Sequence, residues 1–341
     1  MPRILFAGSP EIAVPSLKAI SEMELEGKGV VLAGILTNPD SKRSRHGLEP
    51  TDVSAAALEL DTKRVEMGFR PIIQLKPERL DAKARAEVAA LEAELLVSFA
   101  YGKIFGPLFL AMFQMGGINI HPSLLPKYRG ASPMPAVILA REKETGICIQ
   151  RLAPEMDAGD ILATDYFELD GRETTSSLGK IVSLRSASLL GELLANFDAM
   201  DASARPQNGE TTYCAENKKE EGLIDWNKSA IHIDAQIRAY TPWPLSFTSR
   251  GKDMLFILEA EPVESGYFQR VPDSACSHNA VPGTVLGTDK NRGILIQTGD
   301  GILAVKKLQL QAKKALDWRA FCNGIRDFEG EILGQKTLIA G

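Results

Sequence analysis

The sequence has little cysteine and no long apolar run. Its cysteines, Cys148, Cys214, Cys276 and Cys322, are far apart and lack the paired spacing of zinc ligands. Cys276 and His278 form one Cys-x-His pair, but a second pair is missing, so we predict no metal site. No apolar segment reaches the roughly 20 residues that a membrane span needs, and the N-terminus lacks the features of a signal peptide. We therefore expect a cytoplasmic protein with reduced thiols and no membrane partner.

Neither sign of charge dominates, and the glycine pattern of a dinucleotide site is absent. The formal net charge is -5, so any contact with nucleic acid must come from local basic patches. Gly8 follows the first apolar run alone, without the Gly-x-Gly-x-x-Gly pattern that accompanies hydride transfer from a dinucleotide. A hydrophobic content of 44% over 341 residues is enough for two globular domains, each with its own core.

Apolar runs and amphipathic stretches alternate through the first part of the chain. The runs at 4–7, 30–36 and 95–100 are typical of buried strands. Apolar residues recur at the spacing of an amphipathic helix in 80–91 and 174–197. This alternation predicts an α/β fold with a doubly wound, mostly parallel, Rossmann-like sheet. We expect further strands at 71–73, around Asn119, at 147–152 and at 161–167.

A polar stretch with proline and glycine interrupts this pattern after residue 198. We expect a catalytic domain at 1–205, a linker at 206–216 and a second domain at 217–341. Short apolar runs separated by turn signals predict that the second domain is a small β-barrel. These runs are at 254–258, 283–286, 293–298 and 301–310.

Three polar side chains near the middle of the chain have the chemistry of an acyl-transfer site. Asn119 and His121 are two residues apart on an expected strand, so their side chains share a face. Pro122 and Pro126 stiffen the loop that follows, at the strand end where open α/β sheets bind ligands. Asp157 lies on a loop after the next apolar run.

An amide, an imidazole and a carboxylate can together move an acyl group between nitrogens. Asn119 can donate to a developing oxyanion, His121 can shuttle a proton, and Asp157 can orient the imidazole and hold its charge. No serine or cysteine nucleophile is needed if the acceptor amine attacks directly. A purely structural interpretation is also open, in which Asn119 caps a turn, His121 is satisfied in the core and Asp157 closes an ordinary loop.

The residues around this set resemble those of a known family. The run Asn-x-His-x-Ser-Leu-Leu-Pro-x-Tyr-Arg-Gly from Asn119, followed by Asp-x-Gly-Asp from Asp157, is similar to the folate-dependent formyltransferases, most of all those that act on methionyl-tRNA. The resemblance implies that Asn119, His121 and Asp157 are catalytic. It also implies that the following residues bind 10-formyltetrahydrofolate: Ser123, Leu124, Leu125, Pro126, Tyr101 and Gly102. A core position for Tyr101 is an equal alternative.

The resemblance extends from near residue 3 to about residue 325. It implies formyl transfer from 10-formyltetrahydrofolate to the α-amino group of methionine on initiator tRNA, by a monomer with an OB-like C-terminal barrel. Either His121 or Asp157 would take the proton of the amine.

Two basic clusters are candidates for contact with tRNA. Residues 41–47 hold three cations and no acid, at a place where the tRNA formyltransferases carry a basic loop, although their Gly-Arg-Gly-Lys-Lys run is missing here. The C-terminal region adds four lysines without an acid nearby in the sequence. Solvated surface is the alternative for both clusters, because lysines also block edge pairing. The candidates are Lys42, Arg43, Arg45, Lys306, Lys307, Lys313 and Lys314.

Three other functions use some of the same residues. An amino-sugar nucleotide or glycinamide ribonucleotide could be the formyl acceptor, water could replace the amine and hydrolyse the folate, or the chain could bind RNA without catalysis. The two basic clusters favour a tRNA acceptor over a small one, and the complete set of Asn119, His121 and Asp157 favours catalysis.

Overall fold

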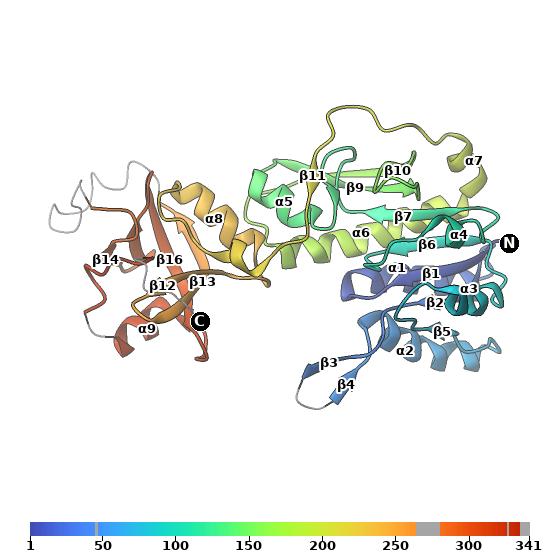
Figure 1. Cartoon of the computed structure of the whole chain (residues 1–341), viewed down its shortest axis with the longest axis horizontal. Helices are drawn as coiled ribbons and strands as arrows, with labels where there is room; N and C mark the ends of the chain where they lie inside the picture. The colour runs from blue at the N-terminus through green and yellow to red at the C-terminus, as the bar shows by residue number, and fades with distance from the viewer. Residues whose placement is uncertain (45–46, 264–279, 326, 335–341) are drawn as a thin grey trace. The chain divides into compact units, whose positions relative to one another are not determined.

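The computed structural model describes residues 1–44, 47–263, 280–325 and 327–334 (Figure 1). The chain divides into two compact units. Unit 1 contains Met1–Pro133, Glu144–Glu168 and Leu178–Ala215, and unit 2 contains Met134–Lys143, Leu169–Ser177 and the described residues from Glu216 onward. Two short segments from the first half of the chain thus belong to unit 2. The predicted domain boundaries at 205 and 217 stay a prediction.

Unit 1 is built on a seven-stranded sheet of order β10-β9-β7-β6-β1-β2-β5. The five strands from β7 to β5 are parallel, and β9 and β10 extend the sheet antiparallel. The predicted mostly parallel, Rossmann-like sheet is therefore confirmed. In chain order the strands are β1 (Arg3–Gly8), β2 (Val31–Leu36), β5 (Gln74–Leu75), β6 (Leu95–Phe99), β7 (Gly117–His121), β9 (Glu144–Arg151) and β10 (Ile161–Glu168).

The helices of unit 1 follow the spacing of apolar residues and the capping residues in the sequence. In α1 (Val14–Leu25) the buried Leu17 and Ile20 lie on one face. Helix α2 (Asp52–Glu66) begins where the Thr51 hydroxyl accepts a hydrogen bond from Ser54, and α3 (Ala82–Ala89) is capped in the same way by Asp81. The remaining helices are η1 (Glu11–Ala13), α4 (Pro107–Leu110), α6 (Thr175–Ala195), whose first residues belong to unit 2, and α7 (Phe197–Ala202).

Two sequence expectations for unit 1 differ from the structure. The strand expected at 71–73 is β5, which begins at residue 74, because only Gln74 and Leu75 pair in register with β2. The basic segment at 41–47 is not a plain loop but a hairpin of β3 (Ser41–Ser44) and β4 (Gly47–Glu49). Hydrogen bonds between the two strands form this hairpin. Residue composition indicated only a turn, and it does not reveal two strands as short as these.

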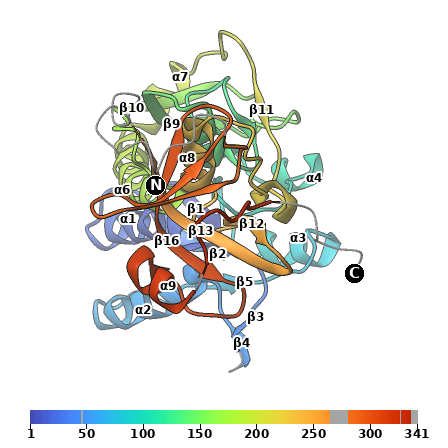
Figure 2. The same cartoon turned by 90° about the vertical axis from the view of Figure 1, so that its left-hand side faces the viewer.

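Unit 2 contains an antiparallel sheet of order β12-β13-β16-β15-β14, with β17 paired to β16 (Figures 1 and 2). The antiparallel architecture agrees with the expected series of short strands, and closure into an OB-like barrel stays a prediction. The strands are β12 (Ser246–Arg250), β13 (Asp253–Pro262), β14 (Val285–Asp289), β15 (Gly293–Gln297), β16 (Ile302–Leu310) and β17 (Leu316–Asp317). The helices are α5 (Pro133–Ala140), almost all of it in this unit, η2 (Lys219–Gly222), α8 (Ala230–Ala239) and α9 (Trp318–Gly324).

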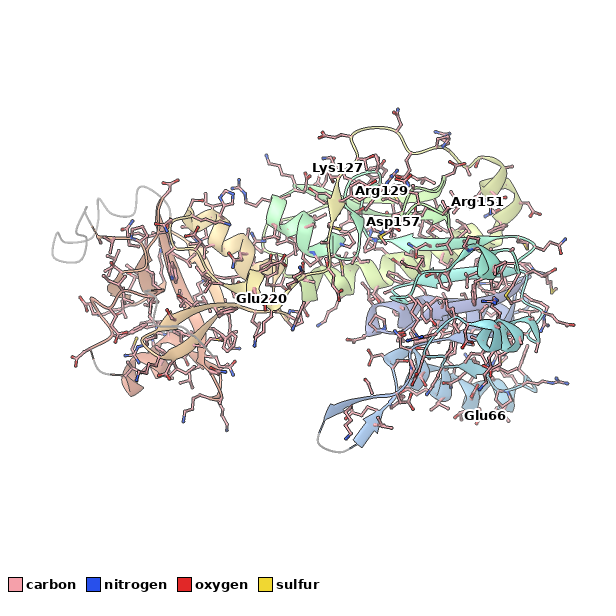
Figure 3. All side chains as sticks on the ribbon, in the orientation of Figure 1. Glu66, Lys127, Arg129, Arg151, Asp157 and Glu220 are labelled. Atoms are coloured by element: carbon pink, nitrogen blue, oxygen red, sulfur yellow. The ribbon has the colours of Figure 1, made fainter. Side chains whose placement is uncertain are left out.

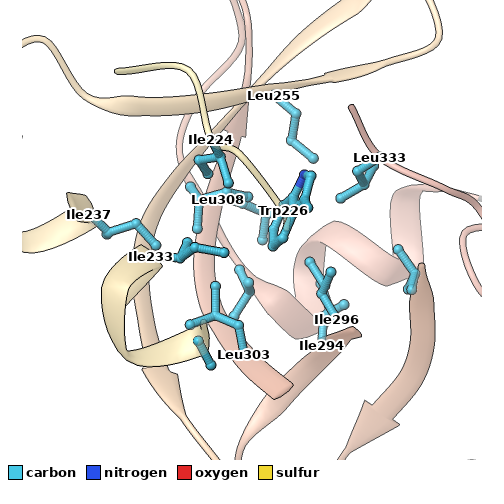
Figure 4. Packing of buried hydrophobic residues seen from close by; sticks show 14 of the residues in the cluster. Ile224, Trp226, Ile233, Ile237, Leu255, Ile294, Ile296, Leu303, Leu308 and Leu333 are labelled. Carbon is cyan, nitrogen blue, oxygen red and sulfur yellow. The ribbon is translucent and has the colours of Figure 1, made fainter. Parts of the chain in front are cut away.

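Helix α8 packs on this sheet and closes its core (Figure 4). Trp226 lies in the middle of the cluster and donates from its indole nitrogen to the Thr248 hydroxyl at 3.0 Å. Ile233 and Ile237 from α8 meet Leu303 and other residues of the sheet, all of them buried. This core gives unit 2 its own hydrophobic stabilisation. Within the part of the chain that the structure describes, no helix is both long and apolar enough to cross a membrane.

Candidate active site

Strand β7 places Asn119 and His121 on one face of the sheet, as their spacing predicts. The neighbouring strand β9 runs antiparallel to it, with Gln150 opposite Asn119 and Cys148 opposite His121. Side chains directly opposite each other on paired strands share a face, so Gln150 joins the two predicted residues. The sequence could not reveal Gln150, because its place depends on the register between two strands.

His121 is nearly fully buried, and its ring is held by the loop that follows β7. Its Nε2 lies 2.8 Å from the carbonyl oxygen of Tyr128. A carbonyl can only accept, so Nε2 carries a hydrogen and donates it. Nδ1 lies 3.6 Å from Oδ2 of Asp157, which is too long for a hydrogen bond but close enough for charges to interact. The expectation that Asp157 holds the tautomer is therefore corrected, since the Tyr128 carbonyl sets it.

The surroundings of His121 act on its pKa in opposite directions. Burial lowers the pKa of His121 below its usual value, because the charged ring loses its hydration. The carboxylate of Asp157 and the carbonyl of Tyr128 raise the same pKa. With burial dominant, the ring is neutral at pH 7 and the Nδ1 lone pair can accept a proton. Asp157 then stabilises the imidazolium that forms.

Asp157 lies at the turn after β9, with both carboxylate oxygens bound (Figure 3). Oδ1 accepts a hydrogen bond from Nε2 of Gln150 at 2.9 Å, and Oδ2 accepts one from the backbone nitrogen of Gly130 at 2.8 Å. The residue has a φ of 52°, in the left-handed region that few residues other than glycine adopt. Contacts with Gln150 and Gly130 therefore hold the carboxylate in place.

The Gly130 position can be filled only by glycine. Its φ is 116°, and a Cβ there would lie 2.2 Å from the carbonyl oxygen of Cys214. This close approach comes from the pairing of β8 (Arg129–Gly130) with β11 (Tyr213–Cys214). The same backbone presents the Gly130 amide to Asp157. The glycine of the Tyr-Arg-Gly run thus serves the carboxylate directly.

Asn119 is the one member of the predicted set whose polar head is free. Its side chain is partly exposed, and its carboxamide makes no hydrogen bond with the residues that the structure describes. A donor that is held on a rigid strand without a partner suits a charge that appears only during the reaction. The carboxamide of Asn119 and Nδ1 of the buried His121 are thus both without a hydrogen bond among the described residues.

The loop predicted to bind the folate is stabilised by a hydrogen bond between two of its own polar groups. Ser123 is fully buried, and its hydroxyl donates to the carbonyl of Lys127 at 2.7 Å. Leu125 and Pro126 are also buried, while Leu124 is partly exposed and packs over Gly146 of β9. The Ser123 hydroxyl therefore stabilises the loop. Contact of this loop with a folate stays a prediction, for which Leu124 and backbone groups are the accessible part.

Tyr101 lies in the core of unit 1. Its ring packs with Phe109 and Phe113 and stacks on Phe105 at 5.5 Å between centroids. Burial raises the pKa of Tyr101 to about 12. Its carbonyl accepts a hydrogen bond from Nδ2 of Asn38, and the next residue, Gly102, is exposed. The structure thus supports the core alternative for the tyrosine ring, and a folate contact at this position falls to Gly102.

The basic candidates for tRNA contact differ in their surroundings. Lys42 on β3 is exposed, the side chain of Arg43 is not described, and Arg45 lies outside the described residues, as do Cys276 and His278. In unit 2, Lys307, Lys313 and Lys314 are exposed.

Two of these lysines have acids beside them on neighbouring strands. Lys306 lies 2.5 Å from Oε2 of Glu261, and Lys307 is paired in register with Glu259 and Asp317. The expectation that no acid lies near these lysines is therefore wrong for both. Strand pairing brings together Lys306 and Glu261, which are 45 positions apart.

Two family models match this chain. The family described as formyl transferase matches residues 3–192, and the family described as formyl transferase, C-terminal domain, matches residues 217–326. The chain belongs to the formyltransferase family. The first match spans the whole candidate site, including Asn119, His121 and Asp157.

Several relatives of this formyltransferase are similar over nearly their whole length. The methionyl-tRNA formyltransferase of Treponema denticola is 47% identical, covering 96% of this chain and 98% of that protein. Those of Treponema pallidum and Borrelia hermsii are 42% and 37% identical, covering 95% and 97% of this chain and 97% and 99% of theirs.

Solved structures share the fold of this formyltransferase at low identity. HypX from Aquifex aeolicus, in complex with tetrahydrofolic acid, has a TM-score of 0.59 at 16% identity, covering 97% of this chain and 48% of that one. The sugar 3N-formyl transferase WlaRD has a TM-score of 0.58 at 18% identity, covering 92% and 99%. These likenesses support the predicted fold and no finer detail.

Proposed function

We propose that this formyltransferase moves the formyl group of 10-formyltetrahydrofolate to the α-amino group of methionyl initiator tRNA, producing N-formylmethionyl-tRNA. One observation carries the proposal: a free amide on Asn119, a free imidazole nitrogen on His121 and the carboxylate of Asp157 converge. They do so in a chain that is 47% identical, over nearly its full length, to a protein named for this reaction.

The first step is formation of the neutral amine. An α-ammonium group has a pKa near 8, so part of it has lost its proton to solvent at pH 7. The nitrogen must lose one more proton once it is bonded to the formyl carbon, and this proton needs an acceptor in the site. Nε2 of His121 is occupied by the Tyr128 carbonyl, which leaves Nδ1 as the nitrogen that exchanges protons. Asp157, 3.6 Å away, stabilises the charge that His121 gains. His121 is therefore the proton acceptor in this mechanism, and Asp157 supports it electrostatically.

The second step forms the carbon–nitrogen bond. The neutral amine attacks the formyl carbon, and the carbonyl oxygen becomes an oxyanion. Asn119 donates a hydrogen bond from its carboxamide to this oxygen, where a positioned donor is typically worth a factor of about 10² to 10³ in rate. No covalent enzyme intermediate forms.

The last step breaks the bond between the formyl carbon and N10 of the folate. The proton on Nδ1 of His121 passes to N10, which leaves as tetrahydrofolate nitrogen. The nitrogen of the acceptor loses two protons in all. The ammonium proton goes to solvent before attack, and the second, lost after the bond to the formyl carbon forms, is taken by Nδ1 of His121 and is the proton that N10 receives. The imidazole returns to its neutral form, with Nε2 still bound to Tyr128.

Both substrates have candidate binding residues. The loop of Ser123, Leu124, Leu125 and Pro126, together with Gly102, is proposed to contact the folate. The exposed Lys42, Lys307, Lys313 and Lys314 are proposed to contact tRNA phosphates, with Arg43, Arg45 and Lys306 as further candidates. The protein is proposed to work as a monomer in the cytoplasm.

The test is a formylation assay with 10-formyltetrahydrofolate and three acceptors: methionine-charged initiator tRNA, uncharged tRNA and an amino-sugar nucleotide. Transfer to the charged tRNA alone is expected. Transfer to the sugar nucleotide alone, or release of formate without any acceptor, would overturn the proposed acceptor while leaving the family intact.

A further inference from the structure

The segment expected to be a linker lies against the candidate active site within unit 1. Residues 212–214 accept hydrogen bonds from backbone amides of the loop that follows β7. The amide of Tyr128 donates to the Thr212 hydroxyl at 2.8 Å, and the amide of Arg129 donates to the Thr212 carbonyl at 2.9 Å. This loop supplies the Tyr128 carbonyl to His121 and the Gly130 amide to Asp157. The segment therefore belongs to the structural support of the site.

Gln207, near the start of this segment, makes the largest set of these contacts. Its Oε1 accepts hydrogen bonds from Nε and Nη2 of Arg129 at 3.1 and 2.8 Å. Its Nε2 lies 2.7 Å from the carbonyl of Asp157, 2.9 Å from that of Gly159 and 3.1 Å from Oε1 of Gln150. An amide nitrogen has only two hydrogens, so the two shorter contacts to backbone carbonyls are the main ones.

These contacts hold the backbone of Asp157 where its conformation needs support. Asp157 has a φ of 52°, which few residues other than glycine adopt and which persists only when the surroundings hold it. Gly159 is pressed against β9, since a Cβ there would lie 1.9 Å from the carbonyl oxygen of Arg151. Gln207 binds the carbonyls of both turn residues.

The geometry points to Gln207 as a positioning residue for formyl transfer, which keeps the carboxylate of Asp157 beside Nδ1 of His121. Gln207 does not act on the reacting atoms. It acts through Asp157, whose Oδ2 lies 3.6 Å from Nδ1 of His121. The two ends of its carboxamide bind the Asp157 turn and the guanidinium of Arg129. The expected effect of Gln207 on kcat rests on the proposed function.

The main test is Gln207→Met, which keeps the length of the side chain and removes its hydrogen bonds. We expect kcat to fall about 10- to 100-fold, because small misplacements of catalytic groups cost this much, while KM for both substrates stays within about twofold. Combining it with Asp157→Asn should add little further loss, since both changes affect one carboxylate. Wild-type kcat in Gln207→Met, or fully multiplicative losses in the double variant, would overturn the role.

A matched control is Gln236→Met in unit 2. Gln236 is a glutamine that is buried, whereas Gln207 is half-buried, and its Nε2 likewise contacts backbone carbonyls: it lies 3.2 Å from each of three, those of Glu221, Gly222 and Leu223. This variant should lower the unfolding temperature without changing kcat. A loss of kcat as large as that of Gln207→Met would mean that general destabilisation explains both results and would overturn the positioning role.

A second variant, Gln207→Glu, guards against failure of the first to fold. A glutamate keeps the acceptor that binds Arg129 but has no hydrogen to donate to the carbonyls of Asp157 and Gly159. We expect a folded protein whose kcat falls about as far as that of Gln207→Met. Wild-type kcat in this variant would show that the Arg129 contact alone matters and would overturn the role.

A measurement without substrates separates this inference from the proposed function. The chain has four histidines, so the ring signals of His121 can be assigned by NMR from their loss in His121→Ala. Gln207→Met should lower the titration midpoint of His121, because the displaced carboxylate no longer raises it. An unchanged midpoint would overturn the positioning role even if formyl transfer is confirmed. Absence of transfer to tRNA in the wild-type protein would instead overturn only the proposed acceptor.

Discussion

The candidate active site in unit 1 and the exposed lysines in unit 2 differ in how firmly the structure holds them. His121 and Asp157 are each bound by groups from other segments, at distances between 2.8 and 2.9 Å. Lys307, Lys313 and Lys314 extend into solvent from a strand and the turn that follows it. Proton transfer needs fixed geometry, whereas attraction to phosphates falls off slowly and tolerates motion. The proposed function therefore assigns the two regions to different requirements of one reaction.

This difference leads to separable effects of mutation. Changes in the candidate active site should affect kcat, and changes among the lysines should affect binding of tRNA and its salt dependence. The four predictions below test that separation.

The largest effect is expected for His121→Ala. Without the imidazole, the proton of the amine has no acceptor and N10 has no donor, so kcat should fall about 10³-fold. Single-turnover formylation measures this loss, and filter binding should show tRNA affinity within about twofold of the wild type. His232→Ala, an exposed histidine on α8, is the control and should keep full activity. Normal turnover in His121→Ala would contradict the catalytic assignment.

A smaller loss, about 10²-fold in kcat, is expected for Asp157→Asn, together with a change in pH dependence. The carboxylate raises the pKa of His121, so its removal lowers that pKa further. The base form of His121 then persists to lower pH, and the acidic limb of the kcat/KM profile should move down in pH. Asp198→Asn, an exposed carboxylate on α7, should leave the profile unchanged. A shift to higher pH in Asp157→Asn would contradict the electrostatic role.

The third prediction concerns tRNA binding. Replacing Lys307, Lys313 and Lys314 together by Ala should raise KM for tRNA several-fold and leave kcat at saturation unchanged. Each lost phosphate contact should reduce the slope of log K against log salt by about 0.7 to 0.9. Replacing the exposed Lys28, Lys63 and Lys83 of unit 1 together provides a charge-matched control, and an equal effect there would show that position does not matter.

The smallest effect should distinguish two adjacent lysines on β16. Lys306 lies 2.5 Å from Glu261, whereas Lys307 is exposed. Lys306→Ala should therefore reduce the salt slope less than Lys307→Ala, and it should change the free energy of unfolding by less than about 1 kcal/mol. Salt titrations of tRNA binding and urea unfolding measure the two quantities. Equal salt slopes in the two variants would show that the ion pair with Glu261 does not matter for binding.

Much of unit 1 could be predicted because its strands are encoded locally. The buried runs that became β1, β2 and β6 are continuous and apolar, and the helices between them keep a regular spacing. The hairpin of β3 and β4 was missed because its short strands are polar. The strand expected at 71–73 was displaced, since pairing with β2 and not hydrophobicity decides where β5 begins.

The residues that support the site were harder to predict than those proposed to carry the chemistry. Asn119, His121 and Asp157 stand in a recognisable run, so their side chains could be named in advance. Gln150 owes its place to strand register. Gln207 contacts Arg129 across 78 positions of sequence, from a segment whose composition indicated only a linker. No local pattern contains such information.

The sequence by itself determined the mostly parallel sheet, the series of short strands after residue 251 and the three polar residues of the candidate site, because periodicity and local motifs encode burial and residue type. Only the tertiary structure decided the partners of those residues. The Tyr128 carbonyl holds His121, the Gly130 amide holds Asp157, and Gln207 holds the turn behind it. The last two contacts join positions 27 and 50 residues apart, and the first depends on how the loop after β7 folds back over seven residues. A hydrogen bond requires both groups to be within about 3 Å of each other.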